Sequence, residues 1–210
     1  MSDLEIPLLV HGESNGFVME REREFLTQYK WLAETFPKLT IVMEHITSAE
    51  SLDTLEHHQN HFATITLHHL LITLDDVAGG LLQPDLFCKP IAKTPKDLKA
   101  LQQAVFSGHS KIMFGSDSAP HPRHKKECCG CAAGIFTSPI ALPMLTELFE
   151  DHHRLENLQG FVSNFAQRIY KIAPQKKQIS LTQESWKVPD IYGEVRPFMA
   201  GRTMRWKVVR

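Results

Sequence analysis

Four short apolar runs recur along the chain, and each is followed at once by polar or small residues. They occupy residues 6–10, 39–43, 62–67 and 111–114. Their apolar residues are nearly continuous rather than alternating, which is typical of strands that are buried on both faces of a parallel sheet. The pattern therefore predicts four strands that lie parallel to one another in one sheet.

Segments with helical spacing separate and follow these runs. In the first, Phe25, Tyr29, Leu32 and Phe36 are spaced by four, three and four residues. A later segment opens with Thr-Pro at 94–95 and an Asp three residues after the Thr, which is a typical helix start. Helices are expected around residues 25–36, 48–57, 94–108, 138–148 and 158–169. The predicted order is β-α-β-α-β-α-β-α-α.

Two stretches have no such pattern. Residues 70–92 contain Gly-Gly and two prolines and are expected to form a long loop after the third strand. Residues 180–210 show no clear periodicity. We expect residues 1–210 to form a single domain, with residues 175–210 as a C-terminal extension that packs on it.

Composition and charge exclude several classes of function. The 210 residues are 42% hydrophobic and 22% charged, with a formal net charge of −1, so electrostatics do not favour nucleic acid or an anionic membrane as a partner. No apolar run approaches the ~20 residues of a membrane-spanning helix. The first residues lack the basic and apolar regions of a signal peptide, so the expected location is the cytoplasm.

The cysteines do not predict a disulfide framework. Cys128, Cys129 and Cys131 are too close together for ordinary pairing, and Cys88 lies far from them in sequence. A zinc knuckle would need a second pair of ligands, which the sequence does not supply at the usual spacing. Reduced thiols beside a functional site are the favoured interpretation.

Polar side chains follow each predicted strand at the point where the strand ends. They are His11, His45, His68 with His69, and Asp117. Because the carboxyl ends of parallel strands meet at one edge, these groups are expected to face a common rim. Neutral imidazole and carboxylate suit zinc and similar ions, which lower the pKa of coordinated water toward ~7. A nearby carboxylate can then move the proton to a leaving nitrogen, so the pattern favours metal-dependent hydrolysis of an amide-like bond.

Structural interpretations stay open for each of these residues. A single histidine at a strand end is more often a hydrogen-bonded structural residue than a ligand. Asp117 could instead cap a turn, and the basic run 121–126 could be a solvated surface. The recurrence at four matching positions is what favours a site.

Five segments carry a resemblance to a known family. They are residues 7–13, 43–47, 64–70, 114–127 and 196–206. Together they resemble dihydroorotase, the amidohydrolase-superfamily enzyme of pyrimidine biosynthesis, in its stand-alone bacterial and fungal type. The most specific of them contains the stretch Gly-Ser-Asp-Ser-Ala-Pro-His.

The resemblance implies a fold, a reaction and a metal centre. The fold is a TIM-type (β/α)8 barrel with two zinc ions per complete site, and the reaction is the reversible cyclisation of N-carbamoyl-L-aspartate to dihydroorotate. By motif match, His11, His45 and Asp117 correspond to metal ligands, and Asp117 also corresponds to the general base. His68 and His69 are not assigned as ligands by the resemblance.

The same match implies contacts to the small-molecule substrate. His121 and the backbone around Ala133 correspond to groups that bind the substrate carboxylate. Lys89 is at the position whose backbone faces the pyrimidine ring.

Parts of the family pattern do not occur in this sequence. The His-x-His pair of the family's first strand and its bridging carboxylated lysine have no counterpart, so the resemblance covers only the C-terminal part, with strands five to eight. At most one partial zinc site is then expected, and activity of this chain alone is doubtful. Its partners would be a second copy in a homodimer or a complementing N-terminal half. The alternatives are a non-catalytic truncated remnant that binds a partner protomer, and an amidohydrolase acting on another cyclic amide.

Overall fold

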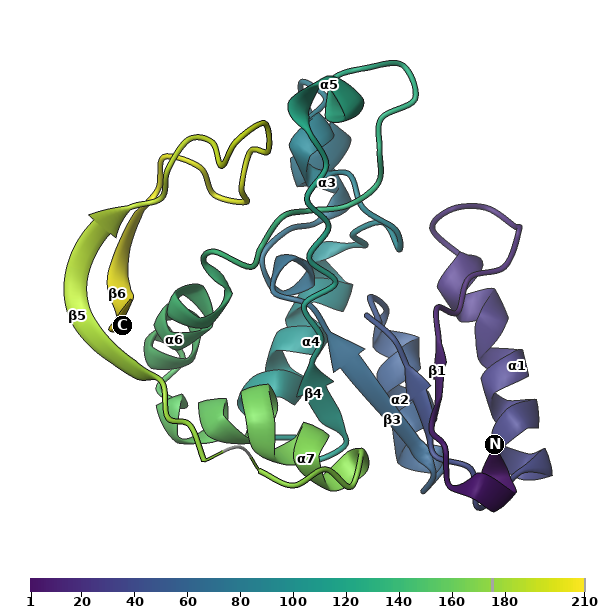
Figure 1. The fold of residues 1–210 in the computed structure, drawn as a ribbon. Coiled ribbons are helices and arrows are strands. Elements are labelled where there is room, and N and C mark those ends of the chain that lie inside the picture. The colour runs from purple at the N-terminus through teal and green to yellow at the C-terminus, as the bar shows by residue number, and fades with distance from the viewer. Residues whose placement is uncertain (175, 210) are drawn as a thin grey trace.

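The computed structural model describes residues 1–174 and 176–209, and a parallel β-sheet forms its centre (Figure 1). The four strands lie side by side in chain order, which confirms the predicted parallel arrangement. They are β1 (Leu8–Val10), β2 (Ile41–Met43), β3 (His61–Ile65) and β4 (Ile112–Phe114). The fold class is therefore α/β.

The strand register sets where each chain segment leaves the sheet. Val10 pairs with Met43, and Met43 pairs with Ala63. Ile65 pairs with Phe114 on the next strand. All four carboxyl ends therefore lie along the same edge, as the argument from the sequence required.

Helices connect the strands, close to their predicted positions. The longer ones are α1 (Arg21–Thr35), α2 (Ala49–His57), α4 (Pro95–Phe106) and α6 (Ala141–Asp151). The predicted start of α4 is confirmed, because the Thr94 hydroxyl accepts a hydrogen bond from the Asp97 N–H while the Asp97 carboxylate accepts one from the Thr94 N–H. None of the helices in the described residues is long and apolar enough to span a membrane.

The last predicted helix is divided rather than continuous. A 3-10 turn (Leu155–Asn157) and a π-helical turn (Gly160–Asn164) precede the short α7 (Phe165–Ile169). The predicted long loop, residues 70–92, also contains structure, namely α3 (Leu74–Ala78) and a 3-10 turn at Pro84–Leu86, and a 3-10 turn at His68–Leu70 leads into it. A further 3-10 turn spans Ser2–Leu4, and the short α5 spans Arg123–Lys126.

The C-terminal segment forms an antiparallel hairpin that the sequence did not predict. It consists of β5 (Ser180–Lys187) and β6 (Thr203–Val209), at the opposite end of the molecule from β1 and α1 (Figure 1). The buried Glu147 of α6 holds β6, since its carboxylate accepts a hydrogen bond from the Arg205 backbone N–H and pairs with the Arg202 side chain at 3.5 Å. One side of β6, which includes Met204 and Trp206, is more buried than the other. This alternation is only a weak signal in the sequence.

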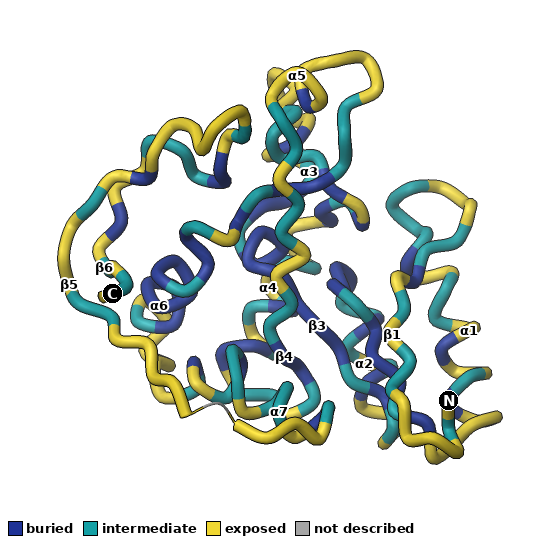
Figure 2. The backbone as a smooth tube through the Cα atoms, viewed as in Figure 1, coloured by how far each residue is buried: buried dark blue, intermediate teal, exposed yellow. Residues whose placement is uncertain are grey.

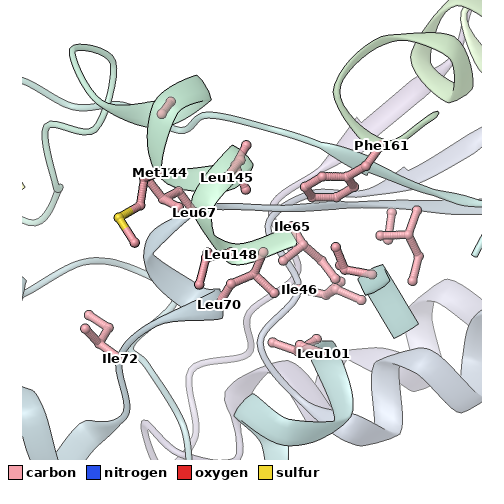
Figure 3. Close-up of a cluster of buried hydrophobic side chains, with 14 of the residues drawn as sticks. Ile46, Ile65, Leu67, Leu70, Ile72, Leu101, Met144, Leu145, Leu148 and Phe161 are labelled. Atoms are coloured by element: carbon pink, nitrogen blue, oxygen red, sulfur yellow. The ribbon is translucent and has the colours of Figure 1, made fainter. Parts of the chain in front are cut away.

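The core lies between the sheet and the helices that cover it. Figure 3 shows side chains from β3 and the following turn (Ile65, Leu67, Leu70) beside Leu101 of α4 and Leu145 of α6. Strands β2 and β3 are buried almost throughout, whereas β1 is more exposed (Figure 2).

A buried carboxylate joins α1 to the segment that follows β2. Glu22 is 3% exposed, and it accepts hydrogen bonds from the backbone N–H groups of Thr47 and Ser48, both at 3.0 Å. The hydroxyls of Thr47, Ser48 and Ser51 donate to it as well. Burial alone would raise the pKa of Glu22, but these hydrogen bonds outweigh it and lower the pKa below the ordinary value. Glu22 therefore fixes the chain two residues beyond His45.

Replacing Glu22 with glutamine should destabilise the fold by about 3 kcal/mol, because buried donors lose a charged acceptor. Since the folded-state pKa is lowered, the stabilisation by Glu22 is fully present above the unfolded pKa of about 4.3 and is lost as pH falls through the folded pKa. Urea unfolding at neutral and acidic pH measures this. The difference in the free energy of unfolding between Glu22→Gln and the natural chain should shrink in acid. The prediction would be contradicted by a difference no larger than that caused by the exposed Glu34→Gln, or by one that does not depend on pH.

Candidate active site

Two histidines converge at the carboxyl edge of the sheet. His11 directly follows β1, and His45 is the second residue after β2. His11 Nδ1 and His45 Nε2 are 3.0 Å apart, and the two rings meet edge to face with centroids 4.7 Å apart. The other nitrogen of His11 is 3.0 Å from the Glu13 carboxylate. The structure thus brings two predicted metal ligands together with their nitrogens facing.

The neighbouring strand sets the orientation of His45. Its backbone is left-handed, with φ 41°, and its N–H donates to the Thr64 hydroxyl at 2.6 Å. The Thr64 hydroxyl in turn donates to Glu44, and the Thr64 carbonyl accepts from the Ile46 N–H. The turn that carries His45 is therefore held by β3 on both sides of the histidine.

Gly115 is required by the same arrangement. A Cβ atom at this position would be 2.6 Å from the Thr64 Cβ atom, and the buried Thr64 cannot give way. A glycine after β4 thus lets the chain pass close to β3 before it reaches Asp117. The close approach to Thr64 is the physical reason for a glycine at the start of the Gly-Ser-Asp sequence.

His45 has the protonation state that a metal ligand needs. Burial, and next the neighbouring His11, lower the pKa of His45 to about 4, so its ring is neutral at physiological pH and carries a lone pair. Its Nδ1 is buried and has no hydrogen-bond partner in residues 1–174 and 176–209. Two imidazoles with facing nitrogens, one of them with an unsatisfied buried atom, fit the donor set of a zinc-type ion.

Asp117 approaches this pair from β4, three residues past the strand, with φ 36°. Partial burial raises the pKa of Asp117, and the charge of His11 acts in the opposite direction. The pKa of Glu44 is also raised, first by burial and then by the charge of Asp117, while the hydrogen bond from Thr64 opposes the rise. A carboxylate with a raised pKa beside two imidazoles is suited to proton transfer.

The structure does not bring all the predicted strand-end residues to one point. Within the described parts of the chain, the only three metal-type side chains whose donor atoms all lie within 4.8 Å of one another are His68, His69 and Cys88. The Asp117 carboxylate is therefore not in an equally tight group with His11 and His45. His68 and His69 are buried in a 3-10 turn, near enough to His45 for its charge to act on both rings.

The predicted substrate contacts lie around two loops. His121 Nε2 is 3.0 Å from the Ala133 carbonyl oxygen, so the structure brings these two residues together. At the neighbouring Gly134, φ is 147° and a Cβ atom would be 2.4 Å from that of Ala119, so only glycine fits. The Lys89 side chain is exposed in the other loop.

Lys126 joins these two loops, and sequence reasoning missed it. Its ammonium group donates to the carbonyls of Phe87, Ala132 and Gly134 at 2.8–2.9 Å, and the residue is 4% exposed. All three N–H donors are thereby satisfied. In the run Arg-His-Lys-Lys, which was interpreted as solvated or anion-binding, nothing in the sequence separates Lys126 from the exposed Lys125.

The comparisons with known proteins agree with this geometry. No family model matches the chain. Dihydroorotase from Helicobacter hepaticus is 44% identical over 98% of this chain and 62% of its own length, and that from Coxiella burnetii is 38% identical over 99% and 62%. The crystal structure of dihydroorotase from Campylobacter jejuni superimposes with a TM-score of 0.94 at 50% identity, over 100% of this chain and 63% of that one.

Two further structures define the breadth of the likeness. Dihydroorotase from Saccharomyces cerevisiae, solved in complex with 5-fluoroorotic acid, gives a TM-score of 0.93 at 35% identity, over 100% of this chain and 64% of that one. L-hydantoinase from Arthrobacter aurescens shares the fold, with a TM-score of 0.82 at 17% identity, over 98% of this chain and 55% of that one. The chain spans a little over three fifths of the length of the dihydroorotases it matches.

The α/β fold is that of the amidohydrolase superfamily of metal-dependent hydrolases. In sequence the chain is a homologue of the dihydroorotases, which it matches over 98% or more of its own residues.

The Lys126 contacts predict an asymmetry between adjacent lysines. Lys126→Met should destabilise the chain by about 2–4 kcal/mol, because three carbonyls, including the buried one of Gly134, lose their charged donor. The same substitution should speed amide exchange at Gly134, whose N–H donates to the Phe87 carbonyl. Urea unfolding measures the loss of stability and hydrogen exchange measures the faster exchange, with Lys125→Met as the exposed control. Equal effects of the two substitutions would refute this role for Lys126.

Proposed function

We propose that this chain carries part of the active centre of a zinc dihydroorotase, which interconverts N-carbamoyl-L-aspartate and dihydroorotate. The observation that carries the proposal is the facing pair His11 and His45, 3.0 Å apart, at a sheet edge shared with Asp117. The 38–44% identity to dihydroorotases supports the choice of this substrate over another cyclic amide.

Each residue at this edge has a distinct part in the proposal. His11 and His45 would hold a zinc ion, which when bound would polarise the substrate carbonyl and activate water. Asp117 takes a proton during the attack and delivers it to the leaving nitrogen. Burial raises the pKa of Asp117 toward the working pH, and a group whose pKa lies nearer that pH is better suited both to accept a proton and to return it.

The loops around His121 and Lys89 bind the substrate in this proposal. The carboxylate faces His121 and the backbone near Ala133, and the ring faces the backbone of Lys89. The yeast relative was solved with 5-fluoroorotic acid, a pyrimidine carboxylate, which supports a ligand of this chemistry. Lys126 serves as a positioning residue, since it ties both loops together.

The proposal includes a larger assembly. We infer that the four strands are strands five to eight of a (β/α)8 barrel, because β1 pairs only with β2 among the described residues and its Leu9 is 50% exposed. A sheet edge of this kind is a site for further strand pairing. The complementing half and a homodimer are the proposed partners. A non-catalytic remnant that binds a partner protomer is the second candidate, favoured by the small number of ligands, His11, His45 and Asp117.

The first test uses the protein as its source makes it, captured through its C-terminal segment. Its intact mass is compared with 23.9 kDa, its zinc is measured, and conversion is followed in both directions. We expect zinc-dependent interconversion. Zinc-loaded protein that converts neither compound would overturn the enzymatic proposal and favour the non-catalytic one.

The second test separates the role of Asp117 from its contribution to folding. Asp117→Asn should lower turnover by about 10²–10⁴-fold, the usual effect of losing a positioned base, while leaving the melting transition nearly unchanged. Asp53→Asn, on the exposed side of α2, is the matched control and should leave turnover unaltered. Turnover that survives Asp117→Asn would exclude Asp117 as the base.

A further inference from the structure

A second group of metal-type side chains, made of residues other than His11 and His45, lies in the core near enough for the charge of His45 to act on it. His68, His69 and Cys88 are 0%, 2% and 1% exposed, and one donor atom of each lies within 4.8 Å of the others. His68 and His69 come from the 3-10 turn after β3, and Cys88 comes from the loop that carries Lys89. We propose that this cluster is a buried site for a thiophilic cation of the zinc type.

The distances around Cys88 resemble one face of a tetrahedral site. Cys88 Sγ is 3.5 Å from His69 Nε2, and the Pro90 carbonyl oxygen is 3.0 Å from that nitrogen and 3.3 Å from the sulfur. Bond lengths of about 2.3 Å to sulfur and 2.0–2.2 Å to nitrogen or oxygen give tetrahedral edges of roughly 3.4–3.6 Å. The three atoms need only small shifts to surround an ion, and His68 supplies the fourth vertex.

His68 is the observation that a purely structural interpretation leaves unexplained. Hydrogen bonds to the Pro90 carbonyl account for both Cys88 and His69 without any ion. Neither ring nitrogen of His68, however, has a hydrogen-bond partner within residues 1–174 and 176–209, although both are buried. A buried polar group without a hydrogen-bond partner destabilises the fold. Coordination by one nitrogen of His68 removes that cost and gives the residue a role.

The protonation states of the cluster are consistent with cation binding. Burial lowers the pKa of His69 to about 3 and that of His68 well below its ordinary value, so both rings are neutral and keep a lone pair. Burial also raises the pKa of Cys88 to about 12, so the free cluster holds a thiol. Binding therefore exchanges the Cys88 proton for the ion, with one proton released to solvent.

The hydrogen bonds of His69 allow the rearrangement that this requires. Nε2 donates its proton to the Pro90 carbonyl in the free state and must lose it to coordinate. The ring proton then resides on Nδ1, where the Thr66 hydroxyl lies 2.8 Å away and can accept it. The bound site has a net charge of +1 for a divalent ion. The negative charges of Glu22 and Asp117, which act on His69 and Cys88 respectively, offset it.

A cobalt titration tests the site independently of catalysis. In the variant with Cys128, Cys129 and Cys131 changed to serine, Cys88 is the single thiol. We expect Co²⁺, added during refolding, to produce a near-ultraviolet thiolate-to-cobalt charge-transfer band at one ion per chain with release of one proton. His11, His45 and Asp117 contain no sulfur, so cobalt at that centre cannot produce this band. Adding Cys88→Ser should abolish the band, and adding His68→Gln should weaken binding at least tenfold.

Two results would overturn the proposal. One is a refolded variant with native circular dichroism that shows no charge-transfer band. The other is a band whose midpoint is unchanged by His68→Gln. The unmodified chain provides a measurement without substitutions: Zn²⁺ should slow alkylation of Cys88 in mild urea and leave the exposed Cys128 unaffected. Unchanged reactivity of Cys88 would equally count against the site, whatever the outcome for dihydroorotate turnover.

Discussion

The candidate centre depends on Thr64, because this single residue of β3 fixes the ends of both neighbouring strands. Its hydroxyl receives the His45 N–H and donates to Glu44, and its carbonyl receives the Ile46 N–H. On its other side, Gly115 packs against its side chain so closely that no Cβ atom fits. The parallel register alone brings the strand ends to one edge. Thr64 converts that common edge into a defined placement of His45 from one side and of Asp117 from the other.

Much of the fold could be predicted from the sequence because burial on two faces leaves a visible pattern. The continuous apolar runs marked β1 to β4, and helical spacing marked the segments between them. The hairpin of β5 and β6 was missed because its strands are mostly exposed, and the two apolar residues of β5, Leu181 and Trp186, are five residues apart and so break the alternation. Its position is set instead by long-range contacts such as Glu147 with Arg205, which no local pattern reveals.

Residues that hold the site by charge were harder to find than the ligands. Glu22 lies in a helix among other charged residues. The five groups that donate hydrogen bonds to it belong to residues 47–51, far away in sequence. Lys126 is one of four consecutive basic residues, yet it alone is buried. All three partners of Lys126 and two of the five donors to Glu22 are backbone groups, and the sequence does not show which backbone groups will be left without partners. Only the three-dimensional path of the loops creates the need for Glu22 and Lys126.

The histidines at the strand ends show why one sequence pattern can lead to two different chemistries. His11, which follows β1, is exposed and meets His45, which follows β2 and is buried, at the edge of the sheet. After β3 the chain folds into a 3-10 turn, which returns His68 and His69 to the core. A centre that turns over substrate must leave a coordination position free, whereas a structural centre is closed by protein atoms. His11 and His45 lie at the kind of edge where a substrate can enter. The cluster of His68, His69 and Cys88, closed by the Pro90 carbonyl, has the character of a site that secures the loop carrying Lys89.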